Sequence, residues 1–469
     1  MTAEQLDLLL LAGALVLLVS IAAVRLSVGT GLPSLLLYLG VGLLLGEDAI
    51  GLDFEDKELT QALGYAALVV ILAEGGLTTP WRSIRPVVPA AAVLATVGTA
   101  VSMAVTAVAA RGLLDLGWRD ALMVGAVLAP TDSAAVFSVL RRVPLPSRLA
   151  GTLEAESGFN DAPAVIIVVA LAGASAPTWW ELVALIGYEL ALGGAIGLAV
   201  GWLGAWGVRR IALPASGLYP IAVLALCVTA YGAAAAAHAS GFLAVYLAAL
   251  VLGNVRLPHR SATRGFAEGM AWLAQIGLFV MLGLLATPSD LGSAVLPALG
   301  IGLVLLLVAR PLSVVAAMWP FDIPWREHAF LSWAGLRGAV PIVLSTVTGQ
   351  DYIFNLVFVL VVVYTIVQGP TLGMVARRLG VASSGEARDL DIESSPLIRL
   401  DADLVQVHID KGSRLAGVEV FELRLPEGAA VTLVVRGGRA FVPGPSTPLN
   451  TGDDLIIVSL ESVRDQVER

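Results

Sequence analysis

One apolar segment of this sequence contains a run of polar residues whose spacing suits ion chemistry. Residues 148–172 are mostly apolar, yet they include Glu154, Glu156, Ser157, Asn160 and Asp161. At 3.6 residues per helical turn, Glu154, Ser157 and Asp161 share one helix face, while Glu156 and Asn160 share the neighbouring face. A carboxylate beside a hydroxyl group supplies the oxygen ligands that hard cations prefer. We therefore expect Asp161 to hold either a cation or a proton.

Two further apolar segments contain a helix breaker next to a charge. Residues 119–140 include Pro130 just before Asp132, and residues 327–348 include Arg337 between glycines and before Pro341. A proline removes a backbone donor and clashes with the preceding turn, so each helix is expected to break there. Broken helices of this kind point to a binding site near the middle of a membrane.

The composition predicts a polytopic membrane protein in contact with a lipid bilayer. Of the 469 residues, 57% are hydrophobic and 14% are Asp, Glu, Lys or Arg, and the mean hydropathy is +0.86. Soluble proteins contain roughly 25% charged residues, so this chain has too few to coat a water-exposed surface. The net charge of −9 argues against a nucleic-acid partner, and the single cysteine excludes an internal disulfide.

The apolar runs predict thirteen membrane-spanning helices, of which the first is a retained span and not a signal peptide. We place them near residues 6–24, 31–46, 61–77, 86–109, 119–140, 148–172, 182–207, 216–237, 240–255, 268–286, 292–317, 327–348 and 353–376. The two interrupted segments are the fifth and the twelfth. Because their offset of seven spans is odd, the second lies upside down relative to the first, as in inverted repeats.

Basic residues in the loops predict the orientation. Fourteen arginines fall on one side: Arg25, Arg82, Arg85, Arg141, Arg142, Arg148, Arg209, Arg210, Arg256, Arg260, Arg264, Arg326, Arg377 and Arg378. Three basic residues, Lys57, Arg111 and Arg119, fall on the other side. By the positive-inside rule the N-terminus is extracytoplasmic and the C-terminus is cytoplasmic.

The remaining charges inside predicted spans each require a partner, water or a function. Glu74 is followed by two glycines, which allow another helix to approach closely. Glu156 is placed to pair with an intramembrane arginine, either Arg310 or Arg337. Asp132 and Asp161 could in principle mimic the paired carboxylates of an intramembrane protease, but nothing else in the sequence supports proteolysis.

The sequence after residue 380 has the polarity of a soluble domain. Residues 381–397 form a Ser/Gly/acidic linker, and residues 398–469 form a small cytoplasmic α+β domain. Alternating apolar residues predict strands at 404–409, 431–435 and 455–458, and short helices are expected over 415–423 and 461–467. We therefore expect two parts, with residues 1–380 forming the membrane domain.

These residues resemble the monovalent cation:proton antiporters, in the branch of bacterial sodium or potassium/proton antiporters and sodium/proton exchangers. The motifs that carry the resemblance are Ala129-Pro130-Thr131-Asp132, Glu156-Ser157 followed by Asn160-Asp161, and Gly335-Leu336-Arg337-Gly338-Ala339. The resemblance covers the third to thirteenth spans. It implies an all-α inverted-repeat fold with two broken crossing helices, a mobile ion-carrying bundle and a separate dimerisation part.

The resemblance also implies a role for each residue of these motifs. The monovalent cation or proton is carried by Asp161, assisted by Ser157, Glu74 and the main-chain carbonyl of Thr131, with Asp132 close by or linked through water. The Asn160-Asp161 pair resembles that of electroneutral exchangers, in which one cation is exchanged for one proton. Arg310 is the preferred partner of Glu156, and Arg337 compensates the helix ends at the crossing.

The tail is similar to the C-terminal subdomain of potassium-conductance regulators, called TrkA-C or RCK_C. The match rests on Val407-His408-Ile409, Gly412-Ser413, Leu415-Ala416-Gly417 and Thr451-Gly452-Asp453. In that family the subdomain can bind a regulatory ligand, such as a cyclic dinucleotide or another nucleotide, at a dimer interface. A dimerisation module without a ligand is the alternative. The resemblance implies a homodimer formed through both the membrane domain and the tail.

We therefore expect a transporter of the inner membrane, not an enzyme, that works without a cofactor in potassium and pH homeostasis. It exchanges K⁺ for H⁺, its substrates, by alternating access with competition at Asp161. A Na⁺/H⁺ antiporter using the same site is the first alternative. A K⁺ channel with a regulatory tail is the second, although no repeated selectivity-filter loop appears in the sequence.

Overall fold

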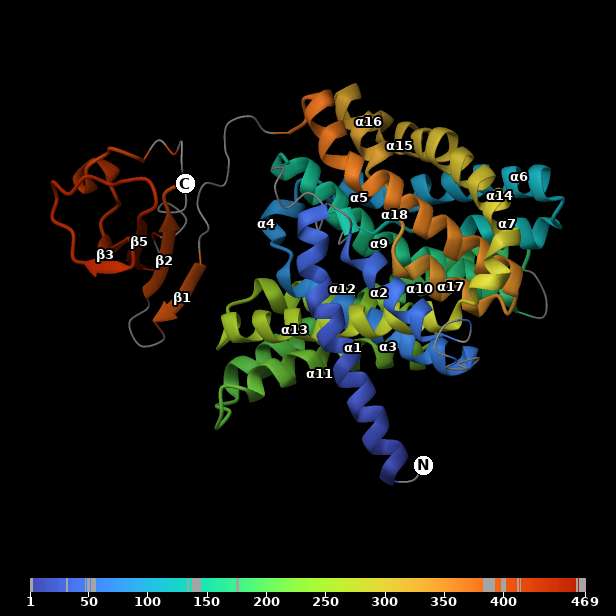
Figure 1. The fold of residues 1–469 in the computed structure, drawn as a ribbon, viewed down its shortest axis with the longest axis horizontal. Coiled ribbons are helices and arrows are strands. Elements are labelled where there is room, and N and C mark those ends of the chain that lie inside the picture. The colour runs from blue at the N-terminus through green and yellow to red at the C-terminus, as the bar shows by residue number, and fades with distance from the viewer. Residues whose placement is uncertain are drawn as a thin grey trace. The chain divides into compact units, whose positions relative to one another are not determined.

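The computed structural model divides the chain into two compact units, Met1–Ala382 and Ser383–Arg469. The structure describes residues 3–30, 33–46, 48, 51, 56–132, 135–136, 145–173, 177–382, 393–397, 402–410, 413, 415–460 and 463. The first unit is helical, and the second contains a five-stranded sheet (Figure 1).

The helices of the first unit follow the apolar runs of the sequence. They are α1 (Ala3–Thr30), α2 (Ser34–Leu45), α3 (Lys57–Thr78), α4 (Trp81–Ile84), α5 (Val88–Val93), α6 (Thr99–Leu114), α7 (Trp118–Val127), α9 (Ser147–Ala172), α10 (Trp179–Arg210), α11 (Leu218–Ala236), α12 (Gly241–Asn254), α13 (Arg260–Leu285), α14 (Pro288–Val304), α15 (Arg310–Met318), α16 (Trp325–Trp333), α17 (Ala339–Val347) and α18 (Asp351–Leu379). Among the described residues, eight helical stretches are long and apolar enough to cross a membrane. The chain is therefore a multi-pass membrane protein.

Two of the predicted spans contain a turn of π-helix. The turn at Leu94–Gly98 joins α5 to α6, and the turn at Leu305–Ala309 joins α14 to α15. A π-turn widens the helix by one residue and often marks a functional position. The second turn ends directly before Arg310, one of the charged residues singled out in the sequence.

Local sequence signals define the ends of several helices. The side chain of Asp56 accepts a hydrogen bond from the backbone of Leu59 at the start of α3, at 2.8 Å. Thr178 and Glu181 form a capping box at the start of α10. Both arrangements satisfy backbone donors that the first helical turn leaves free. Helix α18 ends at Gly380, whose φ of +66° is a conformation that glycine adopts without strain.

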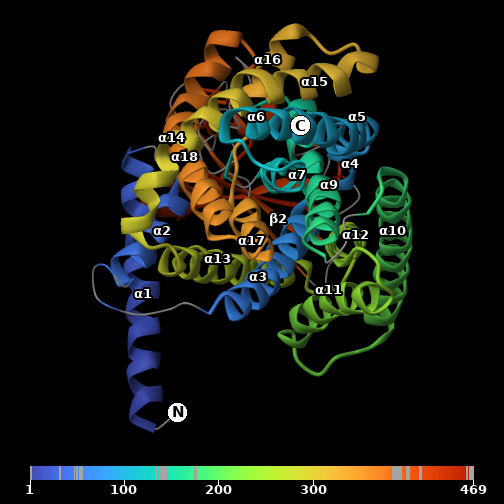
Figure 2. The same cartoon turned by 90° about the vertical axis from the view of Figure 1, so that its right-hand side faces the viewer.

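The helices pack into two groups. One group contains α2, α3 and α10 to α13; the other contains α5 to α7, α9 and α14 to α18 (Figure 2). Helices α9 and α17 of the second group contact the first group, α9 against α10 and α12, and α17 against α3 and α13. Any site between α3 and α9 therefore lies between the two groups.

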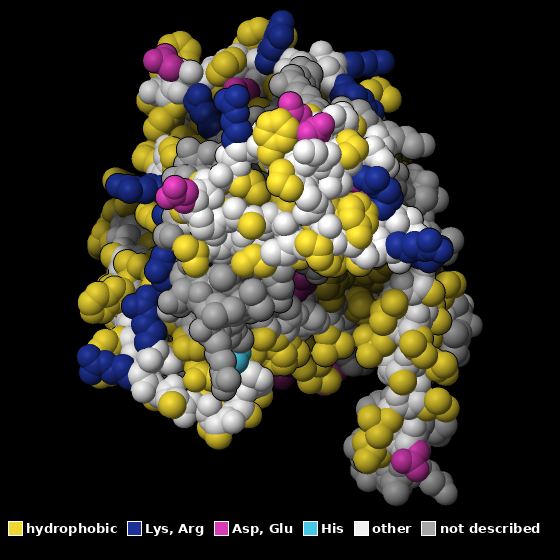
Figure 3. All heavy atoms as spheres, turned by 90° about the vertical axis from the view of Figure 1, so that its left-hand side faces the viewer, with side chains coloured by type: hydrophobic (Ala, Val, Ile, Leu, Met, Phe, Trp, Pro, Cys, Tyr) yellow, Lys and Arg dark blue, Asp and Glu magenta, His cyan; other side chains and the backbone are white. Residues whose placement is uncertain are grey.

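Large hydrophobic side chains are exposed on the outer helix faces. Trp179 and Trp202 on α10, and Leu296 and Leu303 on α14, are among the most exposed. Figure 3 shows further hydrophobic side chains along the projecting helix α1, at the lower right of that view. Exposed apolar surface on this scale is expected where helices face lipid and not water.

The second unit is built on an antiparallel sheet. Its strands are β1 (Glu393–Leu397), β2 (Ala402–His408), β3 (Ala429–Arg436), β4 (Arg439–Phe441) and β5 (Asp454–Leu460), in the order β1-β2-β5-β3-β4. The three strands expected from apolar alternation are β2, β3 and β5. Their inward residues form a small core with Ile409 and Leu449.

Two features of this unit differ from the sequence-based expectation. Strand β1 lies inside the segment 381–397 that we assigned to a linker; it contains Pro396 and, among the described strands, pairs only with β2, as edge strands permit. The helix expected over 415–423 is wrong except for a 3₁₀ turn at Val420–Leu423, since Gly417 has a φ of +90° and Glu419 forms a bridge with Pro448. Most of the helix expected over 461–467 lies outside the described residues.

Candidate functional site

The chain leaves the helical conformation after α7. Helix α7 ends at Val127, and Pro130, Thr131 and Asp132 that follow are not helical. Pro130 has no backbone N–H to continue the helical ladder. The backbone N–H of Asp132 instead donates a hydrogen bond to the carbonyl oxygen of Leu336, at 2.8 Å. This bond ties the segment to the loop between α16 and α17; residues 133–134 and 137–140 of the predicted span 119–140 lie outside the described residues.

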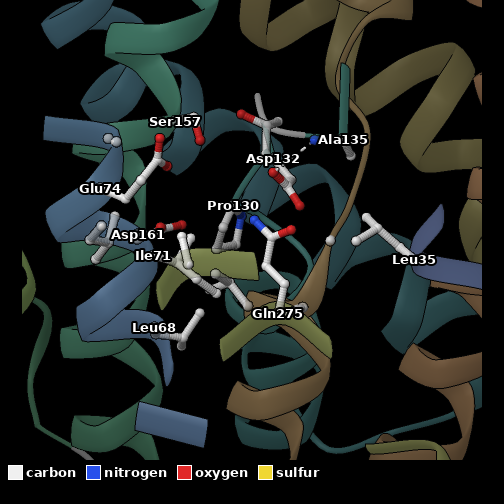
Figure 4. Close-up of a pocket in the computed structure, with 18 of the residues that line it drawn as sticks. Leu35, Leu68, Ile71, Glu74, Pro130, Asp132, Ala135, Ser157, Asp161 and Gln275 are labelled. Atoms are coloured by element: carbon white, nitrogen blue, oxygen red, sulfur yellow. Dashed lines mark hydrogen bonds between the residues drawn. The ribbon is translucent and has the colours of Figure 1, made fainter. Parts of the chain in front are cut away.

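The second non-helical segment covers residues 334–338, between α16 and α17. Gly338 packs directly on Asp132, because a Cβ added to Gly338 would lie 1.7 Å from Asp132 Oδ2. Any other residue at this position would displace the carboxylate. Asp132 Oδ1 also accepts a hydrogen bond from the backbone of Ala135, at 3.2 Å (Figure 4). The two non-helical segments therefore touch and hold Asp132 at their contact.

Helix α9 brings its polar residues to the same place. Asn160 Nδ2 donates a hydrogen bond to Thr131 Oγ1 at 2.8 Å, and both side chains are buried. Asp161 is 7% exposed, and its Oδ1 atom has no hydrogen-bond partner among the described residues. Pro163 lies within α9, so the carbonyl of Phe159 has no helical N–H to accept from.

A cavity of about 370 Å³ lies between the two helix groups. Its polar and aromatic lining includes Glu74, Thr79, Thr131, Asp132, Glu154, Ser157, Asp161, Tyr246, Glu268, Trp272 and Gln275. Figure 4 shows Glu74, Ser157 and Asp161 around one side of the cavity, with Asp132 facing them. The structure thus brings together five of the residues selected from the sequence, and Asn160 reaches this group through Thr131.

The carboxylate of Glu156 is bound by an arginine. Arg310 donates two hydrogen bonds to it, Nη1 to Oε1 at 2.5 Å and Nη2 to Oε2 at 2.9 Å. The two side chains are 5% and 2% exposed, so this bidentate pair is shielded from water. Gly335 packs on Arg310, since an added Cβ would lie 2.7 Å from its Nε. Arg310, not Arg337, is therefore the partner of Glu156.

Arg337 lies outside the cavity lining and is 1% exposed. Its Nε and Nη1 atoms have no hydrogen-bond partner among the described residues. Arg310 and Glu156 lie close enough to Arg337 to interact with it electrostatically. The buried guanidinium groups of Arg310 and Arg337 thus both lie close to the carboxylate of Glu156.

Several residues that line the cavity were not selected from the sequence, among them Tyr246, Glu268 and Gln275. Tyr246 comes from α12, and Glu268 and Gln275 come from α13. A glutamine in the middle of an apolar span was the one signal that pointed to Gln275. The positions of Tyr246 and Glu268 depend on how α12 and α13 pack against α9, which residue spacing does not reveal.

Comparisons with known proteins match the segments that contain these motifs. A family model described as "Sodium/hydrogen exchanger, transmembrane" matches residues 13–378. The chain belongs to this family. Members of the sodium/hydrogen exchanger family are transporters, so the protein is a transporter and not an enzyme. A second model, described as "TrkA-C domain", matches residues 404–469.

Individual relatives span most of the chain. The "K(+)/H(+) antiporter NhaP" of Alkalimonas amylolytica is 39% identical over 388 residues, covering 80% of this chain and 67% of the relative. The "K(+)/H(+) antiporter NhaP2" of Shewanella oneidensis is 37% identical over 482 residues, covering 98% and 83%. The solved structure of the "sodium proton antiporter MjNhaP1" of Methanocaldococcus jannaschii, 22% identical, covers 81% of this chain and all of that chain with a TM-score of 0.71. The fold of the membrane unit is therefore of this type.

The Thr451-Gly452-Asp453 motif of the TrkA-C domain forms a turn. Gly452 has a φ of +87°, and its N–H donates to the carbonyl oxygen of Ile409. The carboxylate of Asp453 is fully buried and accepts two hydrogen bonds from Arg436, both at 2.7 Å, and one from the backbone of Asn450 at 2.8 Å. These hydrogen bonds hold the pKa of Asp453 below its ordinary value.

We expect Asp453→Asn to destabilise the sheet of this domain by about 1–3 kcal/mol at neutral pH, because Arg436 and Asn450 lose an ionised acceptor. The stabilisation is present above the ordinary pKa of an aspartate, about 4, and disappears as the pH falls through the lowered pKa. The difference between wild type and variant therefore narrows in acid. Hydrogen exchange of β2, β3 and β5 in the full-length protein measures it. Asp410→Asn is the control, since Asp410 is exposed, and equal protection in all three proteins contradicts the prediction.

Proposed function

We propose that this protein exchanges a monovalent cation, preferentially K⁺, for H⁺ across the membrane by competition at Asp161. The environment of Asp161 carries this proposal, because its buried carboxylate faces a cavity while the neighbouring Glu156 is already neutralised by Arg310. A carboxylate that is nearly removed from water must be neutralised by a proton or by a cation. Because both neutralise the same group, binding of one displaces the other.

We propose that the surrounding oxygen atoms supply the coordination shell for the cation. Ser157 lies one turn before Asp161 on α9, and Thr131 and Glu74 line the same cavity. The break after α7 leaves main-chain carbonyls there without helical donors, as cation sites of transporters require. We assign the cation to Asp161, Ser157, the Thr131 carbonyl and Glu74, with Asp132 close by, directly or through water.

The choice of cation rests on relatives. The proteins of Alkalimonas and Shewanella are named K⁺/H⁺ antiporters and are 39% and 37% identical to this chain. The alternative, Na⁺/H⁺ exchange at the same site, is supported by the "Na(+)/H(+) antiporter ApNhaP" of Aphanothece halophytica, which is 28% identical over 374 residues. The higher identity and coverage of the first two favour K⁺.

We propose that thirteen spans in two inverted repeats surround this site, with the fifth and twelfth spans crossing as broken helices at Asp132 and Gly338. The cavity reaches Glu268 near the start of α13, an end of the helix that also carries Arg260 and Arg264. By the positive-inside rule this end is cytoplasmic, as is the C-terminus. We propose that the structure represents an inward-open state of an alternating-access cycle.

We propose electroneutral exchange, one cation for one proton. Asn160 carries no charge and uses its amide to hold Thr131. Asp161 is therefore the carboxylate on this stretch of α9 that exchanges its ion, since Glu156 is held by Arg310.

The tail is proposed to regulate transport. We assign residues 1–380 to the exchanger domain in the inner membrane and the sheet from residue 393 onward to a cytoplasmic regulatory domain, joined by the intervening linker. A homodimer formed through both domains is consistent with the TrkA-C match over 404–469. A cyclic dinucleotide or another nucleotide is the proposed regulatory ligand of the tail.

Transport in reconstituted vesicles tests the proposed function. Vesicles loaded with K⁺ and diluted into choline buffer are expected to acidify inside, because each K⁺ that leaves brings in one H⁺. Na⁺ and Li⁺ loading is expected to give slower acidification. An internal pH-sensitive dye measures the rate, and empty vesicles give the background.

Three results would contradict parts of this proposal. Faster acidification with Na⁺ than with K⁺ supports the alternative cation. Acidification that requires an added protonophore identifies a channel, because a channel moves K⁺ without coupling it to H⁺. A rate that changes steeply with imposed voltage argues against electroneutral exchange.

A further inference from the structure

A second group of polar side chains lies in the same cavity, nearer the start of α9. Glu154 lines the cavity and accepts a hydrogen bond from Thr79 Oγ1 at the end of α3. The carbonyl oxygen of Thr79 accepts a hydrogen bond from Asn254 of α12, at 2.9 Å. Glu154 is thus held by the neighbouring helix group, and Arg310 is not its partner.

Tyr246 of α12 completes this group. Its side chain is 2% exposed and lines the cavity, and its ring meets Phe159 edge to face at 5.6 Å. The hydroxyl group lies near Thr79 and Glu154 but forms no hydrogen bond of good geometry with any described residue. A buried tyrosine hydroxyl normally has a partner, so its position in the cavity wall points to a bound ion or water.

Gly158 makes this position available to the tyrosine. A Cβ added to Gly158 would lie 2.4 Å from the Tyr246 ring, so any larger residue would push the ring away. Gly158 lies between Glu154 and Asp161 on α9. The helix that carries Asp161 is therefore shaped to accept Tyr246 beside it.

The spacing along α9 separates this group from Asp161. Glu154 precedes Asp161 by about two helical turns, which is about 10 Å along the axis. Glu74 lines the cavity as well and interacts electrostatically with Glu154 and Glu268. The Glu154 carboxylate, the tyrosine hydroxyl and the threonine hydroxyl offer only oxygen ligands, which suit a hard cation. Their arrangement leaves room in the cavity for water in the remaining positions.

We propose that Glu154 and Tyr246 form an outer binding site for a partly hydrated alkali cation on the path to Asp161. This inference rests on the proposed exchange at Asp161 and adds a site that binds the cation without exchanging it for a proton. A cation at Glu154 replaces part of its hydration shell before it reaches the buried carboxylate. The residues come from α9 and α12, so the site spans the two helix groups.

Binding of K⁺ to a variant that lacks the inner carboxylate tests the outer site directly. A ligand that binds the folded protein raises its unfolding temperature in a saturable way. We expect KCl, compared with choline chloride at equal concentration, to stabilise purified full-length Asp161→Asn, and this stabilisation to be lost when Glu154→Gln is added. Adding Tyr246→Phe instead is expected to raise the half-saturating K⁺ concentration about two- to tenfold, the effect of losing one polar contact.

Tyr65→Phe is the matched control. Tyr65 also carries a buried hydroxyl without a hydrogen-bond partner among the described residues, but it packs on Phe242 and lies outside the cavity lining. Adding it to Asp161→Asn leaves the half-saturating concentration unchanged. If the Glu154→Gln protein does not fold, Glu154→Asp replaces it, with a raised half-saturating concentration expected.

Two results would overturn the outer site. The first is K⁺ stabilisation that is already absent in Asp161→Asn, and the second is K⁺ stabilisation that persists after Glu154→Gln is added. Neither bears on exchange by the wild-type protein, which the vesicle assay measures separately. Wild-type vesicles that do not acidify overturn the proposed function instead.

Discussion

Replacing Asp161 with asparagine is expected to reduce cation-driven proton movement to the background of empty vesicles. Asparagine has nearly the same shape but holds neither a proton nor a cation as a charged carboxylate does. Asp161 is 7% exposed and faces the cavity, and the proposed exchange depends on the charge of its carboxylate. The vesicle assay with internal pH dye measures the effect.

The same substitution is expected to leave the protein folded. Burial of an ionisable carboxylate opposes folding, so a neutral amide at this position leaves the unfolding temperature equal or higher. Size-exclusion chromatography and thermal unfolding of the purified variant check this expectation.

Glu189→Gln is the matched control for Asp161→Asn. Glu189 is a partly buried carboxylate on α10 that does not line the cavity. Its neutralisation is expected to leave the exchange rate close to that of the wild type. Two outcomes would contradict the role of Asp161 as the exchanging carboxylate. One is K⁺-driven acidification that persists in Asp161→Asn. The other is acidification that is lost in Glu189→Gln but not in Asp161→Asn.

Much of the site could be predicted from the sequence, because it depends on the chemistry of residues that are close together in the chain. Pro130 has no N–H to continue the helical hydrogen-bond ladder, so an interruption near it was predictable without knowledge of the fold. The apolar runs around it must be helical in lipid, because backbone groups there have no water to bind. The spacing of Ser157 and Asp161 then predicted a common helix face, and both residues line the cavity.

Contacts between helices that are far apart in the sequence could not be predicted from residue spacing. Tyr246 reaches the cavity because α12 packs on α9 at Gly158, a contact between segments nearly ninety residues apart. From the residues alone, Glu156 had two candidate partners, and only the resemblance favoured Arg310. The structure distinguishes them, since Arg310 forms two hydrogen bonds with Glu156 whereas Arg337 lies beside the pair.

The tail shows the same division between local and long-range information. Strands β2, β3 and β5 alternate apolar and polar residues, as half-buried strands do. Strand β1 has no such alternation and includes Pro396, so its pairing with β2 leaves no signal in the residues themselves. Edge strands are stabilised by their neighbour and not by their own pattern.

The second large effect concerns the buried ion pair of Glu156 and Arg310. We expect Glu156→Gln to destabilise the membrane domain by about 3–5 kcal/mol, because it leaves a buried guanidinium group without a counter-charge. The loss is increased by Arg337, which lies close enough to act on Arg310 electrostatically. Without Glu156, two buried positive charges face each other.

Arg310→Gln is expected to destabilise the membrane domain less than Glu156→Gln does. Arg337 interacts electrostatically with Glu156 and has two donor atoms without partners among the described residues, so it neutralises part of the stranded carboxylate. The double variant is expected to lose less stability than the sum of the losses in the two single variants. Neither an unpaired carboxylate of Glu156 nor an unpaired guanidinium of Arg310 remains in it. Thermal unfolding of all four proteins in the same detergent gives the comparison.

Lys57→Gln provides the control for loss of an ion pair that water reaches. Lys57 pairs with Asp351, and the two side chains are 43% and 74% exposed. Such a pair contributes at most about 1 kcal/mol, so its loss is expected to change the unfolding temperature little. A loss in Glu156→Gln as small as that in Lys57→Gln, or a larger loss in Arg310→Gln than in Glu156→Gln, would contradict the view that three buried charges balance one another behind the cavity.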